Sequence, residues 1–215
     1  KLVLIRSQFS GKITVRLALN NGGVDFSATA SIVVTEPEND PWIQRPPGQN
    51  EKTQDNQFYA RDDTGEGTLY YNGTLDKVAD SVFLKIYADD LLYKKITCKP
   101  GSDNSYSFSV RLKAGLINYK AEFGIRNGDF EKVLETADNI VCGDAYIIDG
   151  QSNAEANDYG NAVNQYTSDW IRSFGCMDTD PDKARLSQWG NAVSYDSAGG
   201  MLQIGYWGIE LSRQL

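Results

Sequence analysis

Ser152 stands in the segment Gly150-Gln151-Ser152-Asn153, directly after the apolar run of residues 145–148. A serine on the sharp turn after a buried strand projects its hydroxyl at the carboxyl end of a sheet, where α/β folds place ligands. Gly150 permits an unusual backbone angle there. The N–H of Ser152, at the start of a following helix, would point toward an oxyanion. The spacing is therefore compatible with a nucleophile, but by itself it favours a helix cap made by Ser152 or Asn153.

The 215-residue sequence contains no histidine. A serine hydroxyl normally needs an imidazole that takes its proton before the oxygen attacks a carbonyl. We therefore expect the chain alone to be inert as a triad hydrolase. Either sequence beyond Leu215 supplies the base or the site has lost its activity. The sequence stops within an uncapped helical pattern, which favours the first alternative.

Composition argues against several classes of partner. The net charge is −8 and the Lys and Arg residues are not clustered, whereas phosphate binding needs clustered cations, so nucleic acid is not expected. No apolar run approaches the ~18 residues of a membrane-spanning helix. Cys98, Cys142 and Cys176 are widely spaced and no histidine accompanies them, so we expect no metal site and no cofactor. The same cysteines permit one disulfide.

The N-terminal part of the chain predicts strands followed by a linker. Residues 11–35 alternate apolar and polar side chains around a turn-rich NNGG, the pattern of a hairpin. Because a lone hairpin is marginal in water, residues 1–36 are interpreted as the closing strands of an incomplete sandwich, similar to Ig-like and PKD modules. Residues 37–57 are rich in Pro, Asn and Gln, which is typical of an extended linker. The alternative is an ordered strap across the next domain, anchored by Trp42 and Ile43.

The remaining sequence changes character once. Residues 58–138 contain short alternating runs between turn signals, which predict an antiparallel β-sandwich. Residues 144–149 include a continuous apolar run, which predicts a buried strand of a parallel sheet. Helical patterns follow at about 180–193 and 201–215. Strand, tight turn and helices are the opening of an α/β unit, so residues 139–215 are predicted to form the first part of an α/β domain.

Other residues suggest sugar chemistry less strongly. Asp144 and Asp149 are a carboxylate pair of the kind that glycosidases use, but their spacing on one short strand points them to opposite faces. Trp189, Tyr195 and Trp207 have the side chains that stack on sugar rings. The favoured interpretation is that at least Trp189 and Trp207 are core residues of helices.

Residues 139–156 resemble the first signature block of the sialate O-acetylesterase-like branch of the SGNH, or GDSL-type, hydrolases. The residues that match in order and spacing are Val141, Gly143, Asp144, Gly150, Gln151, Ser152 and Asn153. Residues 204–215 resemble the helix that follows in this branch, and the preceding β-rich region resembles its accessory domain. The similarity covers about residues 57–215.

This resemblance implies a flavodoxin-like α/β fold for residues 139–215 and an esterase that acts on acyl groups, most often acetyl esters of sugars. It assigns Ser152 as the nucleophile and as an oxyanion donor through its N–H, with Gly150, Gln151 and Asn153 as positioning residues. It also implies an acylated carbohydrate substrate, an extracytoplasmic location and a partner in the rest of the parent polypeptide, because the later oxyanion and Asp-x-x-His blocks are absent. The alternative is a non-catalytic carbohydrate-binding or surface-display protein with a vestigial esterase domain.

Overall fold

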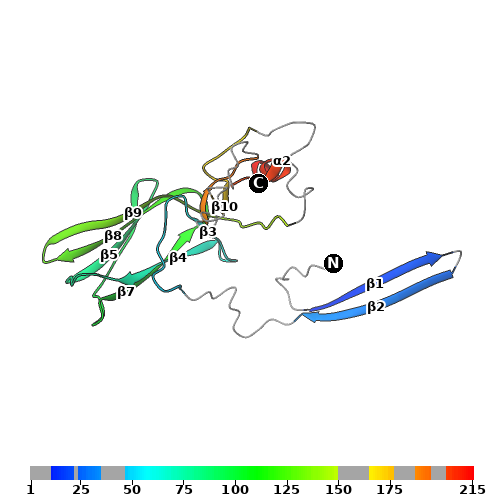
Figure 1. Cartoon of the computed structure of the whole chain (residues 1–215), viewed down its shortest axis with the longest axis horizontal. Helices are drawn as coiled ribbons and strands as arrows, with labels where there is room; N and C mark the ends of the chain where they lie inside the picture. The colour runs from blue at the N-terminus through cyan, green and yellow to red at the C-terminus, as the bar shows by residue number, and fades with distance from the viewer. Residues whose placement is uncertain (1–10, 22–23, 35–46, 150–164, 177–186, 195–201) are drawn as a thin grey trace. The chain divides into compact units, whose positions relative to one another are not determined.

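The computed structural model describes residues 11–21, 24–34, 47–149, 165–176, 187–194 and 202–215 (Figure 1). The chain divides into two units, residues 1–46 and residues 47–215. In the first unit, strands β1 (Gly11–Asn21) and β2 (Val24–Val34) pair antiparallel. The two strands predicted on either side of NNGG are therefore confirmed.

The second unit contains a five-stranded sheet with the order β3-β9-β8-β5-β6. Its strands are β3 (Phe58–Ala60), β5 (Ser81–Ala88), β6 (Leu91–Cys98), β8 (Gly115–Asn127) and β9 (Phe130–Gly143). Neighbouring strands are antiparallel except for β3 and β9, which run parallel. Strands β5 with β6 and β8 with β9 are hairpins, whereas β3 joins the sheet from a distant part of the sequence.

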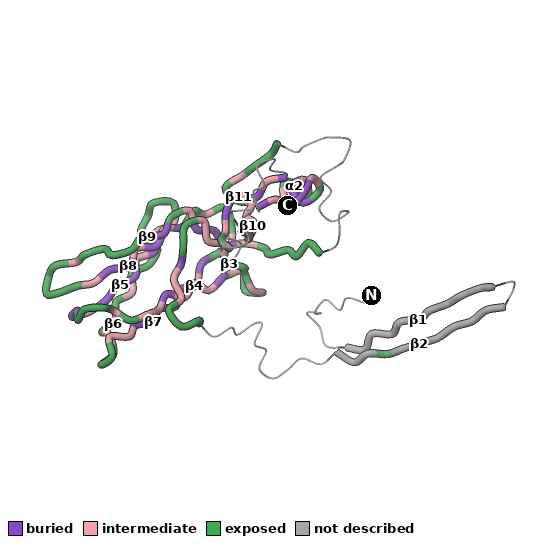
Figure 2. Tube along the Cα trace, viewed as in Figure 1, coloured by how far each residue is buried: buried purple, intermediate pink, exposed green. Residues whose placement is uncertain are grey.

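Strands β4 (Glu66–Thr74) and β7 (Ser105–Lys113) form a separate antiparallel pair. Alternate side chains of β7 are buried, namely Tyr106, Phe108, Val110 and Leu112. They share one apolar core with residues of β5, β8 and β9, so the β4–β7 pair packs on one face of the five-stranded sheet. The buried segments in Figure 2 follow these strands. The period of two therefore produces the predicted two-layered, mostly β architecture.

A buried aromatic side chain also lies on the outer face of the five-stranded sheet. Phe83 of β5 is fully buried and lies opposite Gly124 of β8. The ammonium groups of Lys85 and Lys95 lie 4.6 and 5.6 Å from the centroid of the Phe83 ring. Both lysines pair with Glu131 of β9. A large ring is thus covered outside the core by a glycine and by two lysine side chains held by one carboxylate.

The prediction of a buried strand at residues 144–149 is wrong. Strand β9 ends at Gly143, and residues 144–149 lie outside any strand with exposed side chains. Ile147 is 93% exposed. A fully buried strand needs paired neighbours and two covered faces, and no described strand pairs with this segment. The apolar run therefore follows β9 as an exposed segment without regular secondary structure.

The described residues after position 164 contain two short strands and one helix. Strands β10 (Arg172–Cys176) and β11 (Ser187–Asn191) pair antiparallel, and helix α2 spans Gly205–Gln214. The helix predicted within 201–215 is confirmed, whereas the helix predicted at about 180–193 is wrong for residues 187–191. The described residues contain no parallel α/β sheet, and the flavodoxin-like fold remains a prediction.

Aromatic contacts join this C-terminal part to the sandwich. The Trp189 ring lies 5.1 Å from the ring of Phe58 and 5.2 Å from that of Phe174, measured between centroids. Trp189 lies on strand β11, not on a helix. Trp207 belongs to α2, and its side chain is 39% exposed. The prediction that both tryptophans are core residues of helices is wrong, and Tyr195 lies outside the described residues.

Candidate functional site

The four residues of the predicted catalytic segment, Gly150, Gln151, Ser152 and Asn153, lie outside the described residues. The structure describes the three other residues that carry the resemblance. Val141 and Gly143 belong to β9, the strand next to β3 in the sandwich. Asp144 follows directly, and its carboxylate lies 2.7 Å from the guanidinium of Arg61. Asp144 therefore has an ionic partner on the sandwich, and this pairing raises the pKa of Arg61.

Residues 47–57, here called the strap, are hydrogen-bonded to both sheets of the sandwich. The N–H of Glu51 donates to Asn72 Oδ1 at 2.8 Å, and the N–H of Asn72 donates to the Glu51 carbonyl at 2.8 Å. The N–H of Asn56 donates to the Asp138 carbonyl at 3.0 Å, and the N–H of Asp138 donates to Asp55 Oδ1 at 2.9 Å. The extended linker predicted for 37–57 is therefore wrong for this part, which follows the alternative of an ordered strap, while Trp42 and Ile43 lie outside the described residues.

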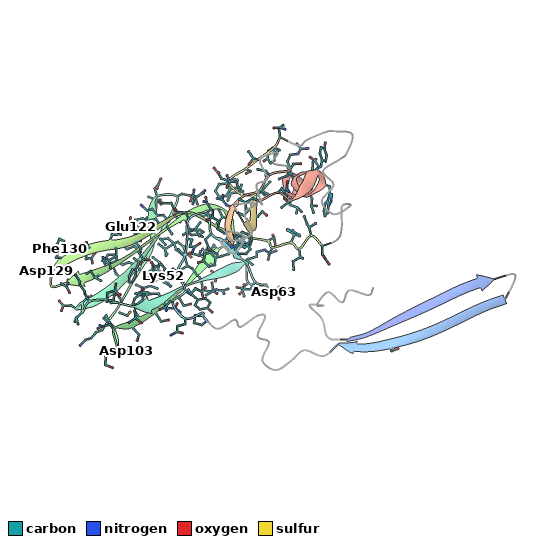
Figure 3. All side chains as sticks on the ribbon, viewed as in Figure 1. Lys52, Asp63, Asp103, Glu122, Asp129 and Phe130 are labelled. Atoms are coloured by element: carbon teal, nitrogen blue, oxygen red, sulfur yellow. The ribbon has the colours of Figure 1, made fainter. Side chains whose placement is uncertain are left out.

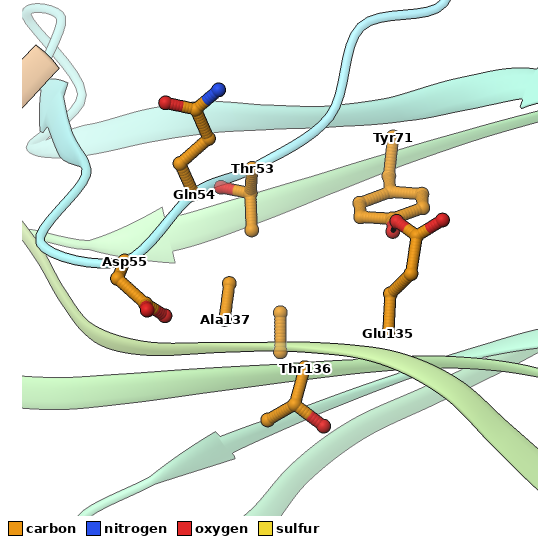
Figure 4. A pocket seen from close by; sticks show the side chains of 8 residues that line it. Thr53, Gln54, Asp55, Tyr71, Glu135, Thr136 and Ala137 are labelled. Carbon is orange, nitrogen blue, oxygen red and sulfur yellow. Dashed lines mark hydrogen bonds between the residues drawn. The ribbon is translucent and has the colours of Figure 1, made fainter.

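The strap forms one wall of a hollow of about 350 Å³ on the sandwich (Figure 4). Its lining residues come from the strap, β4, β8 and β9, and are Thr53, Gln54, Asp55, Tyr71, Ala121, Glu135, Thr136 and Ala137. Tyr71 and Glu135 lie together at one end (Figure 4). The hollow therefore offers two carboxylates, an amide and three hydroxyl-bearing side chains, one of them the aromatic Tyr71, to one small volume. Pockets that bind small molecules are of roughly this size or larger, about 300–1,000 Å³.

The end of the hollow at Tyr71 and Glu135 holds a polar network in which the Tyr71 ring is buried and the Glu135 side chain is half-exposed. The Tyr71 hydroxyl donates to the Glu135 carboxylate. The Lys52 ammonium donates to both oxygens of Glu135, at 3.1 and 3.2 Å. Burial and the nearby carboxylate raise the pKa of Tyr71, so its phenol stays protonated. Burial raises the pKa of Glu135, but the hydrogen bonds from Tyr71 and Lys52 outweigh this effect and lower it, so Glu135 stays ionised.

This chemistry suits binding better than catalysis. Hydroxyl groups of a ligand find acceptors at Asp55 and Glu135 and a donor and acceptor at the Gln54 amide. No imidazole exists in the sequence to activate a hydroxyl. The hydroxyl of Thr53 is buried and hydrogen-bonded to that of Tyr59, so it is committed to holding the strap.

A second polar hollow, of about 380 Å³, is lined by Asp89, Asp90, Asn118, Lys120, Asp138 and Asn139. Its polar groups bond to one another. The N–H of Asn118 donates to Asp89 Oδ1 at 3.0 Å, and the side-chain amide of Asn139 donates to Asn56 Oδ1 at 2.7 Å. These bonds hold the turn between β5 and β6, where Asp89 has a positive φ angle, and the irregularity in the β8–β9 pairing, where Asn139 has one. The second hollow is therefore explained by local backbone structure.

The described residues contain no group of three or more His, Cys, Asp or Glu side chains placed to hold a metal ion. Cys98 and Cys142 are free thiols. Burial raises the pKa of both thiols, which keeps them protonated and disfavours thiolate chemistry.

No known protein family, no curated protein and no solved structure matches the chain. Within the part of the chain that the structure describes, every helix is too short or too polar to cross a bilayer.

Sequence reasoning missed the hollow beneath the strap. Residues 47–57 carry no apolar side chain after Pro47, so no periodic pattern indicates that they pack on a sheet. The positive φ angles of Asn50 and Asn56 mark turns, and asparagine at those positions was the available signal for local order.

Proposed function

We propose that the chain is part of a carbohydrate O-acylesterase, most simply an acetylesterase, in which Ser152 is the nucleophile. The proposal rests on residues 139–156, where seven residues match the signature block of the sialate O-acetylesterase-like hydrolases in order and spacing. Gly150, Gln151 and Asn153 position the serine, and the Ser152 N–H donates to the oxyanion. The protein acts outside the cytoplasm on acylated carbohydrate, with no cofactor.

The reaction needs a base from outside these residues, because the sequence has no histidine. The Ser152 oxygen attacks the ester carbonyl while its proton passes to a histidine. The sugar oxygen then leaves and takes that proton, so the acyl group is held on the serine. Water attacks this acyl-serine ester, releases the acid and returns the proton to Ser152. By itself the 215-residue chain binds the ester without cleaving it.

The test is hydrolysis of an acetylated sugar by the polypeptide extended with whatever sequence is encoded after Leu215. An Asp-x-x-His segment is expected in that sequence. Replacing Ser152 with Ala should reduce the rate by several orders of magnitude and leave the circular dichroism spectrum unchanged. A Ser152→Ala variant that keeps its esterase activity would refute the assignment.

A second candidate function is carbohydrate binding without catalysis, and the hollow beneath the strap favours it. Its side chains combine hydroxyl, amide and carboxylate groups with the ring of Tyr71, the types that bind the hydroxyl groups and apolar faces of sugars. The exposed, irregular state of residues 144–149 also fits a sandwich that functions without a completed esterase domain.

The second candidate is tested by titrating neutral and acetylated oligosaccharides into the isotope-labelled 215-residue chain. Binding should shift the side-chain amide resonances of Gln54 and the backbone resonances of residues 135–137. The variant Gln54→Ala should weaken these shifts, and Ser102→Ala, at an exposed position outside the hollow, should leave them unchanged. Shifts that fall elsewhere, or none at all, would exclude the hollow as the binding site.

A further inference from the structure

The ammonium group of Lys52 lies against three aromatic rings. Its Nζ atom is 4.7 Å from the centroid of Tyr71, 5.0 Å from that of Phe123 and 5.4 Å from that of Tyr106. Phe123 stacks between the two tyrosines, with centroid separations of 4.9 and 4.6 Å. Glu135 adds two charge-assisted hydrogen bonds. Three π faces and one carboxylate around a cation are the elements of an aromatic cage for an ammonium group.

The cage is assembled from every layer of the sandwich. Tyr71 comes from β4, Tyr106 from β7, Phe123 from β8 and Glu135 from β9. Figure 3 marks Lys52 in the middle of the domain, where it reaches the strands from the strap. The three rings are buried, whereas the Lys52 side chain is 29% exposed. The ammonium therefore closes the solvent-facing side of the cage.

Lys52 is the only cationic residue of the strap, whose sequence is PGQNEKTQDNQ. Other bonds between strap and sandwich include neutral hydrogen bonds and a bond to Asp55, and the bond between the Thr53 and Tyr59 hydroxyls is buried. Neutral hydrogen bonds each contribute modestly to net stability. A cation that contacts three rings and is partly desolvated adds a charged attachment to these bonds.

The cage and the hollow share two residues. Tyr71 and Glu135 contact the Lys52 ammonium and also line the hollow, and the next three strap residues, Thr53 to Asp55, form the opposite wall. If the Lys52 ammonium left the cage, these three strap residues would move away from β9. The volume of the hollow therefore depends on where the ammonium lies.

We propose that Tyr71, Tyr106, Phe123 and Glu135 form an alkylammonium-binding site whose resident ligand is Lys52, and that occupancy of this site closes the strap to form the hollow. Lys52 is thus a positioning residue for any ligand of the hollow. The ammonium site does not depend on which molecule binds in the hollow, and only the statement about carbohydrate rests on the proposed function.

The test compares amide hydrogen exchange in the strap of the wild type with that of Lys52→Met and Lys52→Ala. The N–H groups of Glu51 and Asn56 are the probes, because both donate to the sandwich. Both variants should speed their exchange by on the order of tenfold. Protected amides of the β5–β8 ladder should be unchanged, which shows that the sandwich remains folded. The control Lys85→Met removes an ammonium that lies 4.6 Å from a single ring on the outer face and should leave the strap unaffected.

Binding of a small cation separates an ammonium site from a packing role. Lys52→Ala leaves the cage empty, so methylammonium chloride should shift the ring resonances of Tyr71, Tyr106 and Phe123, whereas sodium chloride at the same ionic strength should not. Free methylammonium has no covalent link to the strap, so strap exchange should stay fast. In Lys52→Met the methionine side chain fills the space, and methylammonium should have no effect. Unchanged strap exchange in Lys52→Ala, or ring shifts that sodium produces equally, would overturn the proposal.

Oligosaccharide titration of the same variants separates the two proposals. If the wild type binds sugar in the hollow, Lys52→Met should bind it more weakly and Lys85→Met equally well. If the wild type binds no sugar but strap exchange responds to the Lys52 variants and the cage of Lys52→Ala binds methylammonium, carbohydrate binding fails and the ammonium site stands. If sugar binds equally to the wild type and Lys52→Met, the coupling between cage and hollow is refuted.

Discussion

Replacing Gly124 with Ala should strongly destabilise the sandwich. A Cβ atom at this position would lie 2.3 Å from Phe83 Cζ and 2.3 Å from the Lys132 carbonyl oxygen. The oxygen belongs to the backbone of the neighbouring strand and cannot rotate away. Phe83 is fully buried between its neighbours, so it would have to leave its site. Overpacking costs about 1–3 kcal/mol, and exposing a phenylalanine costs about 1.5–3 kcal/mol, so the expected loss is about 2.5–6 kcal/mol.

The measurement is urea unfolding followed by circular dichroism at the β-sheet band. The matched control is Gly143→Ala, also in a strand of the same sheet, where the nearest atom to an added Cβ is Phe58 Cε2 at 3.8 Å. This control should change the free energy of unfolding by less than about 1 kcal/mol. The double variant Gly124→Ala with Phe83→Leu should recover part of the loss, because the smaller side chain relieves one of the two clashes. The backbone clash remains.

Two outcomes would refute this reasoning. One is a Gly124→Ala protein as stable as the wild type, which would mean that β8 and β9 separate locally without cost. The other is an equal loss in Gly143→Ala, which would show that the effect comes from the change of a strand glycine and not from the contacts of Gly124.

Two further predictions concern acid and exposed apolar surface. Hydrogen bonds from Thr64 and Arg111 lower the pKa of Asp62 in the folded protein. The stabilisation by the Asp62 carboxylate is therefore present above the ordinary carboxyl pKa and is lost as the pH falls toward the pKa of the folded state. Asp62→Asn should reduce the difference in urea midpoint between about pH 6 and pH 3, and an unchanged difference would contradict this. Tyr146, Ile147 and Ile148 are exposed, so the native chain should bind a fluorescent hydrophobic dye and Ile147→Asp should reduce its fluorescence; equal fluorescence would place the dye elsewhere.

The sequence predicted the elements whose pattern repeats with one period over many residues. Alternation along β7 and its partners is dictated by the two faces of a strand, so it identified the sandwich without knowledge of the neighbours. The helix at 205–214 was predicted from apolar positions spaced for one face, and Ile209 is fully buried there. These patterns are local, and local signals survive folding when tertiary contacts agree with them.

The sequence-based predictions are wrong where contacts with residues distant in the sequence decide the local structure. The run at 144–149 has the composition of a buried strand, but a strand needs a partner, and the described residues provide none. Residues 187–191 follow a proline-initiated helical pattern, yet Gly190 packs so closely on Leu202 that an added Cβ would lie 2.4 Å from Leu202 Cδ1. Pairing with β10 therefore outweighs a weak helical preference. Lys52 could not be assigned because its cage is formed by residues far apart in the sequence.

The parallel pairing of β3 with β9 has a mechanical consequence. These are the first and last strands of the five-stranded sheet along the chain, and Phe58 lies opposite Val141. Tension applied through residue 47 and residue 149 would pull β3 and β9 in opposite directions along their common axis. The hydrogen bonds between them, with those from Arg61 N–H to the Gly143 carbonyl and from Val141 N–H to the Gln57 carbonyl, would share this load and break together. A sandwich with antiparallel end strands would instead open one bond at a time, so this topology resists stretching when its flanking segments are pulled.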